Sequence, residues 1–297
     1  MSAKKSNFII RALSGIVFVA LLVGCIVSHP YAYALLFAAI TGLTTWEFCS
    51  IVNRNAHLQV NRFIATASAV YLFAAMLVFN VGLMQSEVFI PYLISIMYLL
   101  ISELYFDRET NIYNWAFALM SQLYVALPFA LLNTLSFIAV PAQMDYCTQI
   151  AYYYWYPLSV FIFLWASDTG AYCVGSLLGR HRLFPRISPG KSWEGSVGGA
   201  VVAIVASQLV ATYIPFNPQM DELQSRLAWC GMALVIVVFG TWGDLVESLL
   251  KRRLGIKDSG NIIPGHGGML DRFDSSLMAI PATVIYLYTI QQLMQQQ

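Results

Sequence analysis

Charged residues are scarce in this chain. Of its 297 residues only 10% are Asp, Glu, Lys or Arg, whereas 59% are hydrophobic. A soluble domain is typically about 25% charged and about 45–50% apolar. The composition therefore excludes an ordinary water-soluble globular protein. The 16 basic and 15 acidic residues nearly balance, and no nucleic-acid partner is expected.

Other signals are also missing. The five cysteines are scattered and form no CxxC pair, which argues against a zinc site or a disulfide framework. No small-residue cleavage site follows the first apolar stretch, because Ser28-His29-Pro30-Tyr31 leads straight into the next one. That stretch is therefore interpreted as a retained anchor. No internal repeat is visible, so an inverted-repeat transporter lacks its usual trace.

What the chain has instead is a series of apolar runs of about 20 residues, the length needed to cross a bilayer as a helix. They predict an all-α polytopic integral membrane protein with about nine transmembrane helices. The approximate spans are 10–27, 31–52, 63–80, 87–105, 115–139, 154–176, 195–214, 227–249 and 275–293.

The placement of lysine and arginine predicts the orientation, because cytoplasmic loops carry an excess of both. With the N-terminus inside, the loops after the second, fourth, sixth and eighth spans are also inside. Of the 16 basic residues, only Arg226 is then left on the outer side. The pattern favours an odd helix count, with a cytoplasmic N-terminus and the C-terminus outside.

The charges that exist are concentrated near the end of the chain. Between Asp244 and Asp274 there are 31 residues, of which ten are charged. Charges near a bilayer are costly and are usually kept for a function. Glycines and a proline interrupt this stretch, which indicates a shaped polar loop.

This stretch resembles the signature of the CDP-diacylglycerol synthases, or phosphatidate cytidylyltransferases. All fixed positions of the signature are filled, and more than ten such positions within 27 residues make the resemblance specific. They are Ser248, Lys251-Arg252, Lys257-Asp258, His266-Gly267-Gly268, Asp271-Arg272 and Asp274.

A second segment, Ser188-Pro189-Gly190-Lys191-Ser192-Trp193, is similar to the same family. It is not a Walker loop, because the GxxxxGK[ST] spacing fails. Gly190 lets the backbone approach a ligand, Lys191 supplies a positive charge, and Ser192 is expected to cap the next helix, whose N-terminus favours an anion. The alternative is a cytoplasmic loop that is basic only because cytoplasmic loops generally are, followed by a capped helix. Here serine stands where threonine is common in the family, and Glu194 stands where glutamine is often found.

Carboxylates flank the basic loop in two pairs. Asp244 and Glu247 are three residues apart, as are Asp271 and Asp274, so each pair shares a helix face. Oxygen ligands beside a phosphate site suit Mg²⁺. In the family resemblance the positions of Asp244 and Asp271 hold the divalent metal, with a second cation close by. For Asp271 the alternative is a cap with a salt bridge to Arg272, and for Glu247 a structural partner of Lys251.

The resemblance implies that CTP and phosphatidate give CDP-diacylglycerol and pyrophosphate by a Mg²⁺-dependent in-line displacement at the inner membrane face. The residues expected to act in catalysis are Asp244, Asp271, Lys251 and Asp274. Those expected to bind substrate are Asp168, Ser188, Lys191, Ser192, Arg252, Lys257, Asp258, His266, Gly267, Gly268 and Arg272. The contacts are not divided between the two substrates. The resemblance also implies a homodimer.

The two halves of the sequence are expected to have different roles, because both motifs lie in the second half. Residues 1–150 are expected to form a transmembrane scaffold, and residues 151–297 a catalytic transmembrane region with cytoplasmic motif loops at 177–194 and 250–271. Glu47 and Glu103 lie near the inner ends of scaffold helices. Either they cap or pack at the membrane edge, or they belong to a lipid or dimer site.

Alternatives remain open. Another polytopic enzyme that uses CTP would differ in the acceptor, and the complete signature favours phosphatidate. A transporter or channel would use buried carboxylates as an ion path, although the charges cluster in two inner loops. A catalytically dead scaffold is disfavoured because no charged motif position is lost. Without a long N-terminal extension, the expected location is a bacterial cytoplasmic membrane.

Overall fold

The computed structural model describes residues 2–106, 108–141, 148–262 and 267–295. The chain divides into two compact units. The first unit comprises Met1–Trp155 and Lys251–Phe273, and the second comprises Tyr156–Leu250 and Asp274–Gln297. The polar stretch between Lys251 and Phe273 thus packs with the N-terminal helices of the chain.

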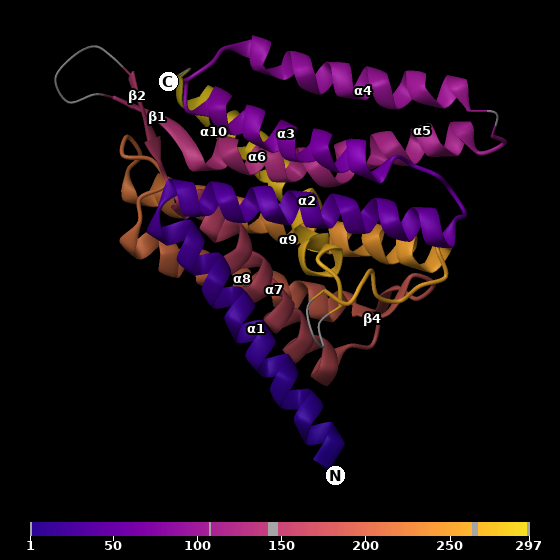
Figure 1. Cartoon of the computed structure of the whole chain (residues 1–297). Coiled ribbons are helices and arrows are strands. Elements are labelled where there is room, and N and C mark those ends of the chain that lie inside the picture. The colour runs from indigo at the N-terminus through magenta and orange to yellow at the C-terminus, as the bar shows by residue number, and fades with distance from the viewer. Residues whose placement is uncertain (1, 107, 142–147, 263–266, 296–297) are drawn as a thin grey trace. The chain divides into compact units, whose positions relative to one another are not determined.

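Helices dominate the first unit (Figure 1). A two-stranded antiparallel hairpin pairs Phe137 with Tyr152. The elements of this unit are α1 (Ser2–Ser28), α2 (Pro30–Asn55), α3 (Arg62–Asn80), η1 (Ser86–Phe89), α4 (Ile90–Ser102), η2 (Glu103–Tyr105), α5 (Asn111–Met120), η3 (Ser121–Ala126), α6 (Leu127–Ser136), β1 (Phe137–Pro141) and β2 (Thr148–Tyr152).

The second unit is built from four helices and one short hairpin. Its elements are α7 (Trp155–Leu178), β3 (Arg182–Phe184), β4 (Ser188–Ser192), α8 (Trp193–Tyr213), α9 (Glu222–Arg253) and α10 (Leu270–Gln295). The last turn of α9 and the first turn of α10 belong to the first unit. The segment 177–194, expected as a loop, therefore contains the β3–β4 hairpin.

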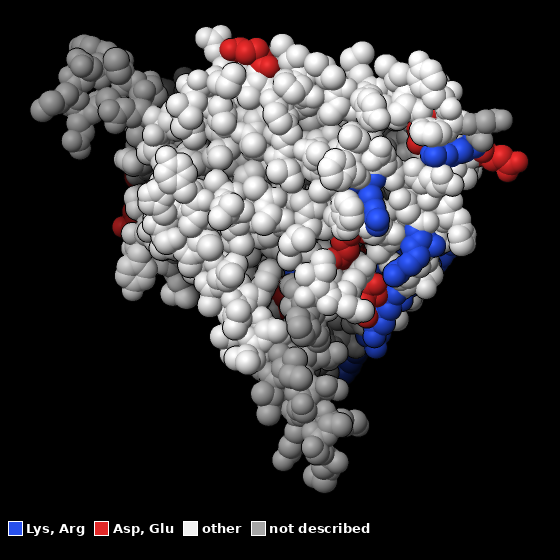
Figure 2. All heavy atoms as spheres, viewed as in Figure 1, with Lys and Arg blue, Asp and Glu red and all other residues white. Residues whose placement is uncertain are grey.

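All nine predicted spans fall mainly on helices, although the span 115–139 runs past α6 into β1, and this confirms an all-α polytopic membrane protein. Among the described residues, eight helices are long and apolar enough to cross a bilayer, and Leu13–Ser28 adds a shorter apolar helix. Figure 2 shows a face covered mostly by uncharged side chains, as lipid exposure requires. Helix α10 begins at Leu270, five residues before the predicted start of the last span at 275.

Local signals explain where the first helices begin and end. The α1–α2 break falls at His29, whose Nδ1 accepts from the Tyr31 N–H, and Pro30 opens α2. Proline suits a first helical turn because its missing N–H would be unsatisfied there anyway. Asn61 caps α3 by accepting from the Ile64 N–H at 3.2 Å. Helices α2 and α3 then pack side by side (Figure 1).

In the second unit, glycines let α7 and α8 approach closely. A Cβ on Gly198 would clash with the Val174 side chain, and one on Gly199 would meet the Ser167 carbonyl oxygen at 2.6 Å. Small residues at such contacts are typical of membrane helix pairs, which lack a hydrophobic driving force and depend on close packing. This contact fixes the base of the β3–β4 hairpin, which joins the two helices.

Candidate active site

The second unit contains a cluster of three carboxylates. Asp244 and Glu247 lie one turn apart on α9, and Asp274 lies on α10. One oxygen from each of these three side chains lies within 4.8 Å of the other two. Three negative groups this close repel one another unless protons or a cation compensate them. Hard oxygen donors of this kind match the preference of Mg²⁺, so the donor set fits a divalent cation.

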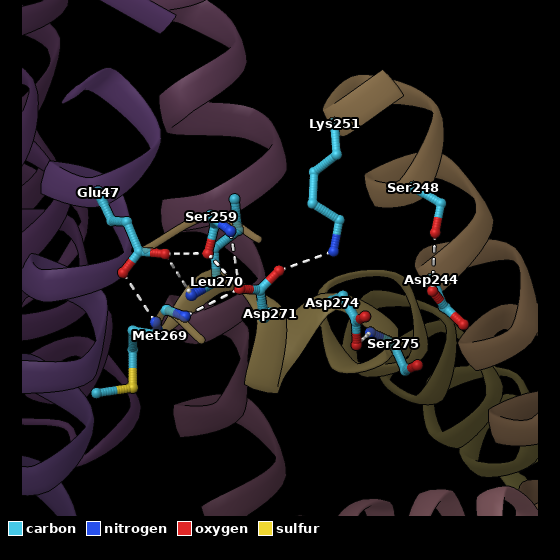
Figure 3. A network of polar contacts seen from close by, with 11 residues as sticks. Glu47, Asp244, Ser248, Lys251, Ser259, Met269, Leu270, Asp271, Asp274 and Ser275 are labelled. Atoms are coloured by element: carbon cyan, nitrogen blue, oxygen red, sulfur yellow. Dashed lines mark hydrogen bonds and ion pairs between the residues drawn. The ribbon is translucent and has the colours of Figure 1, made fainter. Parts of the chain in front are cut away.

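A basic residue from the second motif reaches this cluster. Lys191 on β4 forms an ion pair with Asp244, and its Nζ lies 3.4 Å from the Thr241 carbonyl oxygen. The other Asp244 oxygen accepts from the Ser248 hydroxyl at 3.1 Å, as Figure 3 shows. The structure therefore brings together Lys191 of the second motif and Asp244, which precedes the signature in the sequence.

A cavity of about 580 Å³ opens beside Lys191 in the second unit. Its polar lining comes from α7, the hairpin and the start of α8, with Thr241 of α9 and Ser275 of α10. Three residues predicted to bind substrate contribute to it, namely Asp168, Lys191 and Ser192, and Arg182 adds a second positive charge. A space of this size suits a small-molecule ligand, and its two basic side chains favour an anionic one.

The start of α8 is built as the sequence predicted. Ser192 caps the helix, because its buried hydroxyl accepts from the Gly195 N–H at 3.1 Å. Glu194 in the first turn accepts from the backbone N–H groups of Arg180 and His181 at 3.2 Å, and its carboxylate lies 2.5 Å from His181 Nδ1. Glu194, which stands where glutamine is often found in the family, thus stabilises the turn that leads into β3.

The first unit holds a different polar network, centred on Ser259. The Ser259 hydroxyl contacts the Glu47 carboxylate and lies 2.9 Å from Asp271 Oδ2 (Figure 3). Asp271 Oδ2 also accepts from the N–H groups of Ser259 at 2.8 Å and Gly268 at 2.9 Å. Asp271 Oδ1 forms an ion pair with Lys251 Nζ at 2.7 Å. Lys251, rather than Arg272, is the basic partner of Asp271.

Glu47 belongs to this network although it is far away in the sequence. It is 5% exposed and accepts from the Met269 N–H at 2.8 Å and the Leu270 N–H at 3.3 Å. These donors lie at the N-terminus of α10, where a carboxylate is favoured. The structure shows that Glu47 caps the start of α10. A carboxylate inside an apolar helix was the only sequence signal for it.

Two glycines of the signature make room for these carboxylates. Gly267 has a φ of +88°, a conformation that strains other residues. A Cβ on Gly267 would meet Asp271 Oδ2 at 2.5 Å, and one on Gly268 would clash with Glu47. The glycine pair is therefore required by the packing of two buried acidic side chains around it.

The remaining predicted residues lie in several places. Lys257 and Asp258 line a second cavity, which is in the first unit. Ser188 begins β4 and pairs with Phe184 in the hairpin. Arg252 and Arg272 are exposed in the last turn of α9 and the first turn of α10. His266 lies outside the described residues. Sequence reasoning missed Ser259 and Arg182, which carry no distinguishing local pattern.

Comparison with known proteins agrees with this arrangement. A family model described as the cytidylyltransferase family matches residues 9–290. The chain is similar to proteins named phosphatidate cytidylyltransferase. One from Staphylococcus saprophyticus is 33% identical over 273 residues, covering 91% of this chain and 93% of the relative. One from Haemophilus influenzae is 32% identical over 282 residues, covering 91% and 95%. One from Staphylococcus haemolyticus is 35% identical over 221 residues, covering 74% and 77%. With a family match across most of its length and a lysine–carboxylate site built from both motifs, this chain belongs to the cytidylyltransferase family.

Proposed function

We propose that this protein transfers CMP from CTP to phosphatidate, giving CDP-diacylglycerol and pyrophosphate. The observation that carries the proposal is the contact between Lys191 and Asp244. Lys191 lines the cavity and lies beside three clustered carboxylates. A metal-assisted reaction of a nucleotide phosphate needs such an arrangement. Relatives named phosphatidate cytidylyltransferase, 32% and 33% identical over 91% of the chain, support the choice of acceptor.

The reaction is an in-line displacement at the α-phosphorus of CTP. A phosphate oxygen of phosphatidate forms the new P–O bond while the bond from the α-phosphorus to the bridging oxygen of the β-phosphate breaks. Pyrophosphate leaves with the electron pair of that bond. The phosphate nucleophile is already anionic at neutral pH, so no strong general base is needed. Positioning and charge neutralisation carry such chemistry.

We assign the cavity of the second unit to the nucleotide. Lys191 and Arg182 would neutralise phosphate oxygens there, while Ser192 holds the start of α8. Asp168 lines the same cavity and would orient a substrate. The roles of Ser188, Arg252, His266 and Arg272 in substrate binding stay predictions, as do catalytic roles for Lys251 and Asp274.

A Mg²⁺ ion fits the carboxylates of the second unit. Asp244 would hold it, with Glu247 and Asp274 as the nearest further donors. When bound, the ion would neutralise developing charge on the phosphates. The sequence prediction that Asp271 is a ligand, and that a second cation binds, stays a prediction. Asp271 already accepts from Lys251, Ser259 and Gly268, so its substitution needs a structural control.

The test is pyrophosphate release by purified protein in detergent, with and without phosphatidate and Mg²⁺. Turnover that requires both is expected, and it is expected to be lost in Asp244→Asn. Glu222→Gln is the matched control, because this α9 carboxylate is exposed and pairs only with its neighbour Arg226 among the described residues. Turnover of CTP without phosphatidate, or with a different lipid only, would overturn the assigned acceptor.

A second comparison tests Asp271. Asp271→Asn and Glu47→Gln both weaken the network at Ser259. If Asp271 is also a metal ligand, only Asp271→Asn raises the Mg²⁺ concentration needed for half-maximal activity. Undiminished activity of a well-inserted Asp271→Asn protein would rule out that role.

We propose that the protein lies in a bacterial cytoplasmic membrane as a homodimer, with its N-terminus and both motif segments on the side where CTP is available. Single cysteines introduced near Arg54 and Arg226, which the predicted orientation puts on opposite sides, would test it. Labelling of the Arg226 site alone by a membrane-impermeant reagent on intact cells is expected, and the reverse pattern would refute the orientation. Crosslinking in native membranes would give the oligomeric state.

A further inference from the structure

The first unit contains a cavity of its own, of about 640 Å³. It lies where α2 ends and α3 begins, and the segment 256–261 of the signature closes another side. Two arginines on the predicted inner side of the membrane, Arg54 and Arg62, line it together with Lys257. In Figure 2 blue side chains gather where α2 connects to α3.

The charges of this cavity leave it positive. Arg54, Arg62 and Lys257 face two acidic residues, Glu47 and Asp258. In the part of the chain that the structure describes, none of the three cations forms an ion pair with a carboxylate. The Glu47 charge is instead compensated by the Ser259 hydroxyl and the amides at the start of α10. Three cations are therefore available to an anion.

The cavity also borders an apolar surface. The Arg62 guanidinium lies over the Trp46 ring, 4.4 Å from its centroid. Trp46 is 38% exposed, Phe63 next to Arg62 is 70% exposed, and Leu43 lies one turn from Trp46 on the exposed face of α2. Exposed aromatic residues at helix ends are typical of the membrane–water interface. An anion bound here thus lies beside exposed apolar side chains that suit contact with hydrocarbon chains.

We infer that Arg54, Arg62 and Lys257 bind the phosphomonoester headgroup of the lipid acceptor. This assignment rests on the proposed function and gives the lipid phosphate its own basic residues, all of them in the first unit. A phosphomonoester carries about −1.5 to −2 charges at neutral pH, which three cations match. Arginine suits it because its planar fork binds phosphate oxygens in pairs.

Activity separates the two substrates. The double variant Arg54→Gln/Arg62→Gln is expected to raise the KM for phosphatidate by about tenfold or more, equivalent to the loss of one charge-assisted hydrogen bond. The KM for CTP should stay within about twofold, since an uninvolved surface position changes little. Arg108→Gln is the matched control, because Arg108 pairs with Glu103 and does not line the cavity. A rise in the KM for CTP instead would overturn the assignment.

Thermal melting in detergent tests the site without turnover, because a ligand that binds the folded state raises its stability. Short-chain phosphatidate is expected to stabilise the wild type, and to stabilise the double variant far less, while CTP stabilises both equally. Diacylglycerol of the same chain length and glycerol 3-phosphate separate the apolar and phosphate contributions.

Each outcome of the melting experiment decides the inference. Equal stabilisation of wild type and double variant by phosphatidate refutes the site, as does no stabilisation of either. Equal stabilisation by inorganic phosphate and phosphatidate would make it a plain anion site and refute the lipid assignment. If phosphatidate protects only the wild type and yet no CDP-diacylglycerol forms, the lipid site stands while the proposed reaction fails.

Discussion

Carboxylate side chains have different surroundings in the two units. In the first unit, Glu47 and Asp271 are surrounded by donors from Ser259, the backbone and Lys251. In the second unit, Asp244, Glu247 and Asp274 lie beside one another. A carboxylate supplied with donors stabilises the fold, whereas carboxylates crowded together favour a cation. The comparison shows that the neighbours of a carboxylate decide whether it stabilises the fold or is suited to bind a cation.

This comparison predicts separate consequences for activity and stability. The strongest test is Asp244→Asn, which removes a charge from the crowded cluster. Activity should fall by at least about a hundredfold, since weakening even the outer shell of a metal site costs about 10–100-fold. The apparent melting temperature should change little, because the relief of repulsion offsets the loss of the ion pair with Lys191. Steady-state kinetics and thermal melting of the same preparation measure both.

Mg²⁺ sharpens that test. Added Mg²⁺ should raise the melting temperature of the wild type, because the ion binds the folded state. Asp244→Asn should lose this shift, and the exposed control Glu222→Gln should keep it. A shift of equal size in Asp244→Asn would mean that the cation binds elsewhere, and the contrast between the units would fail.

Glu47→Gln should give the reverse result. The amide keeps the shape but loses the charge that accepts from Ser259 and from the first turn of α10. Hydrogen bonds to charged groups contribute about 1.5–3 kcal/mol, so a loss of stability of this order is expected. Thermal inactivation should accelerate, while the Mg²⁺ dependence of the remaining activity stays as in the wild type. A changed Mg²⁺ dependence with unchanged stability would contradict a structural role.

A smaller effect is expected at Ser192. Ser192→Ala removes the hydroxyl that caps α8 and lines the second unit's cavity. Loss of such a cap typically costs about 1 kcal/mol. Ser192→Thr keeps the hydroxyl and should restore the melting temperature. Restoration of stability without restoration of the KM for CTP would show that the residue also contacts the nucleotide.

The smallest effect is expected at Glu194, a half-buried residue that accepts from the backbone N–H groups of Arg180 and His181. Glu194→Gln keeps an acceptor for both amides and should change the KM for CTP by less than about twofold, because the turn keeps its hydrogen bonds. Glu194→Ala should change it more, because the turn into β3 is then held by fewer bonds. Equal effects of both variants would show that charge, rather than hydrogen bonding, matters here.

Sequence reasoning predicted the helical spans well, because a run of about 20 apolar residues is a local property that the bilayer selects by length. It also predicted the Ser192 cap, since a hydroxyl three residues before its partner N–H needs only local geometry. It did not predict the β3–β4 hairpin, whose three-residue and five-residue strands are too short to leave a pattern.

The sequence by itself determined that this chain spans a membrane, that its charges gather in two motifs, and which family those motifs belong to. Only the tertiary structure decided the partners of each carboxylate. Asp271 and Asp274 are three residues apart and look equivalent, yet one bonds to Ser259 and Lys251 while the other lies beside Asp244 and Glu247. Glu47 caps amides 222 and 223 residues away. The spans and the Ser192 cap follow from neighbours in the chain, whereas the contacts of Glu47 and Asp271 depend on which helices pack together.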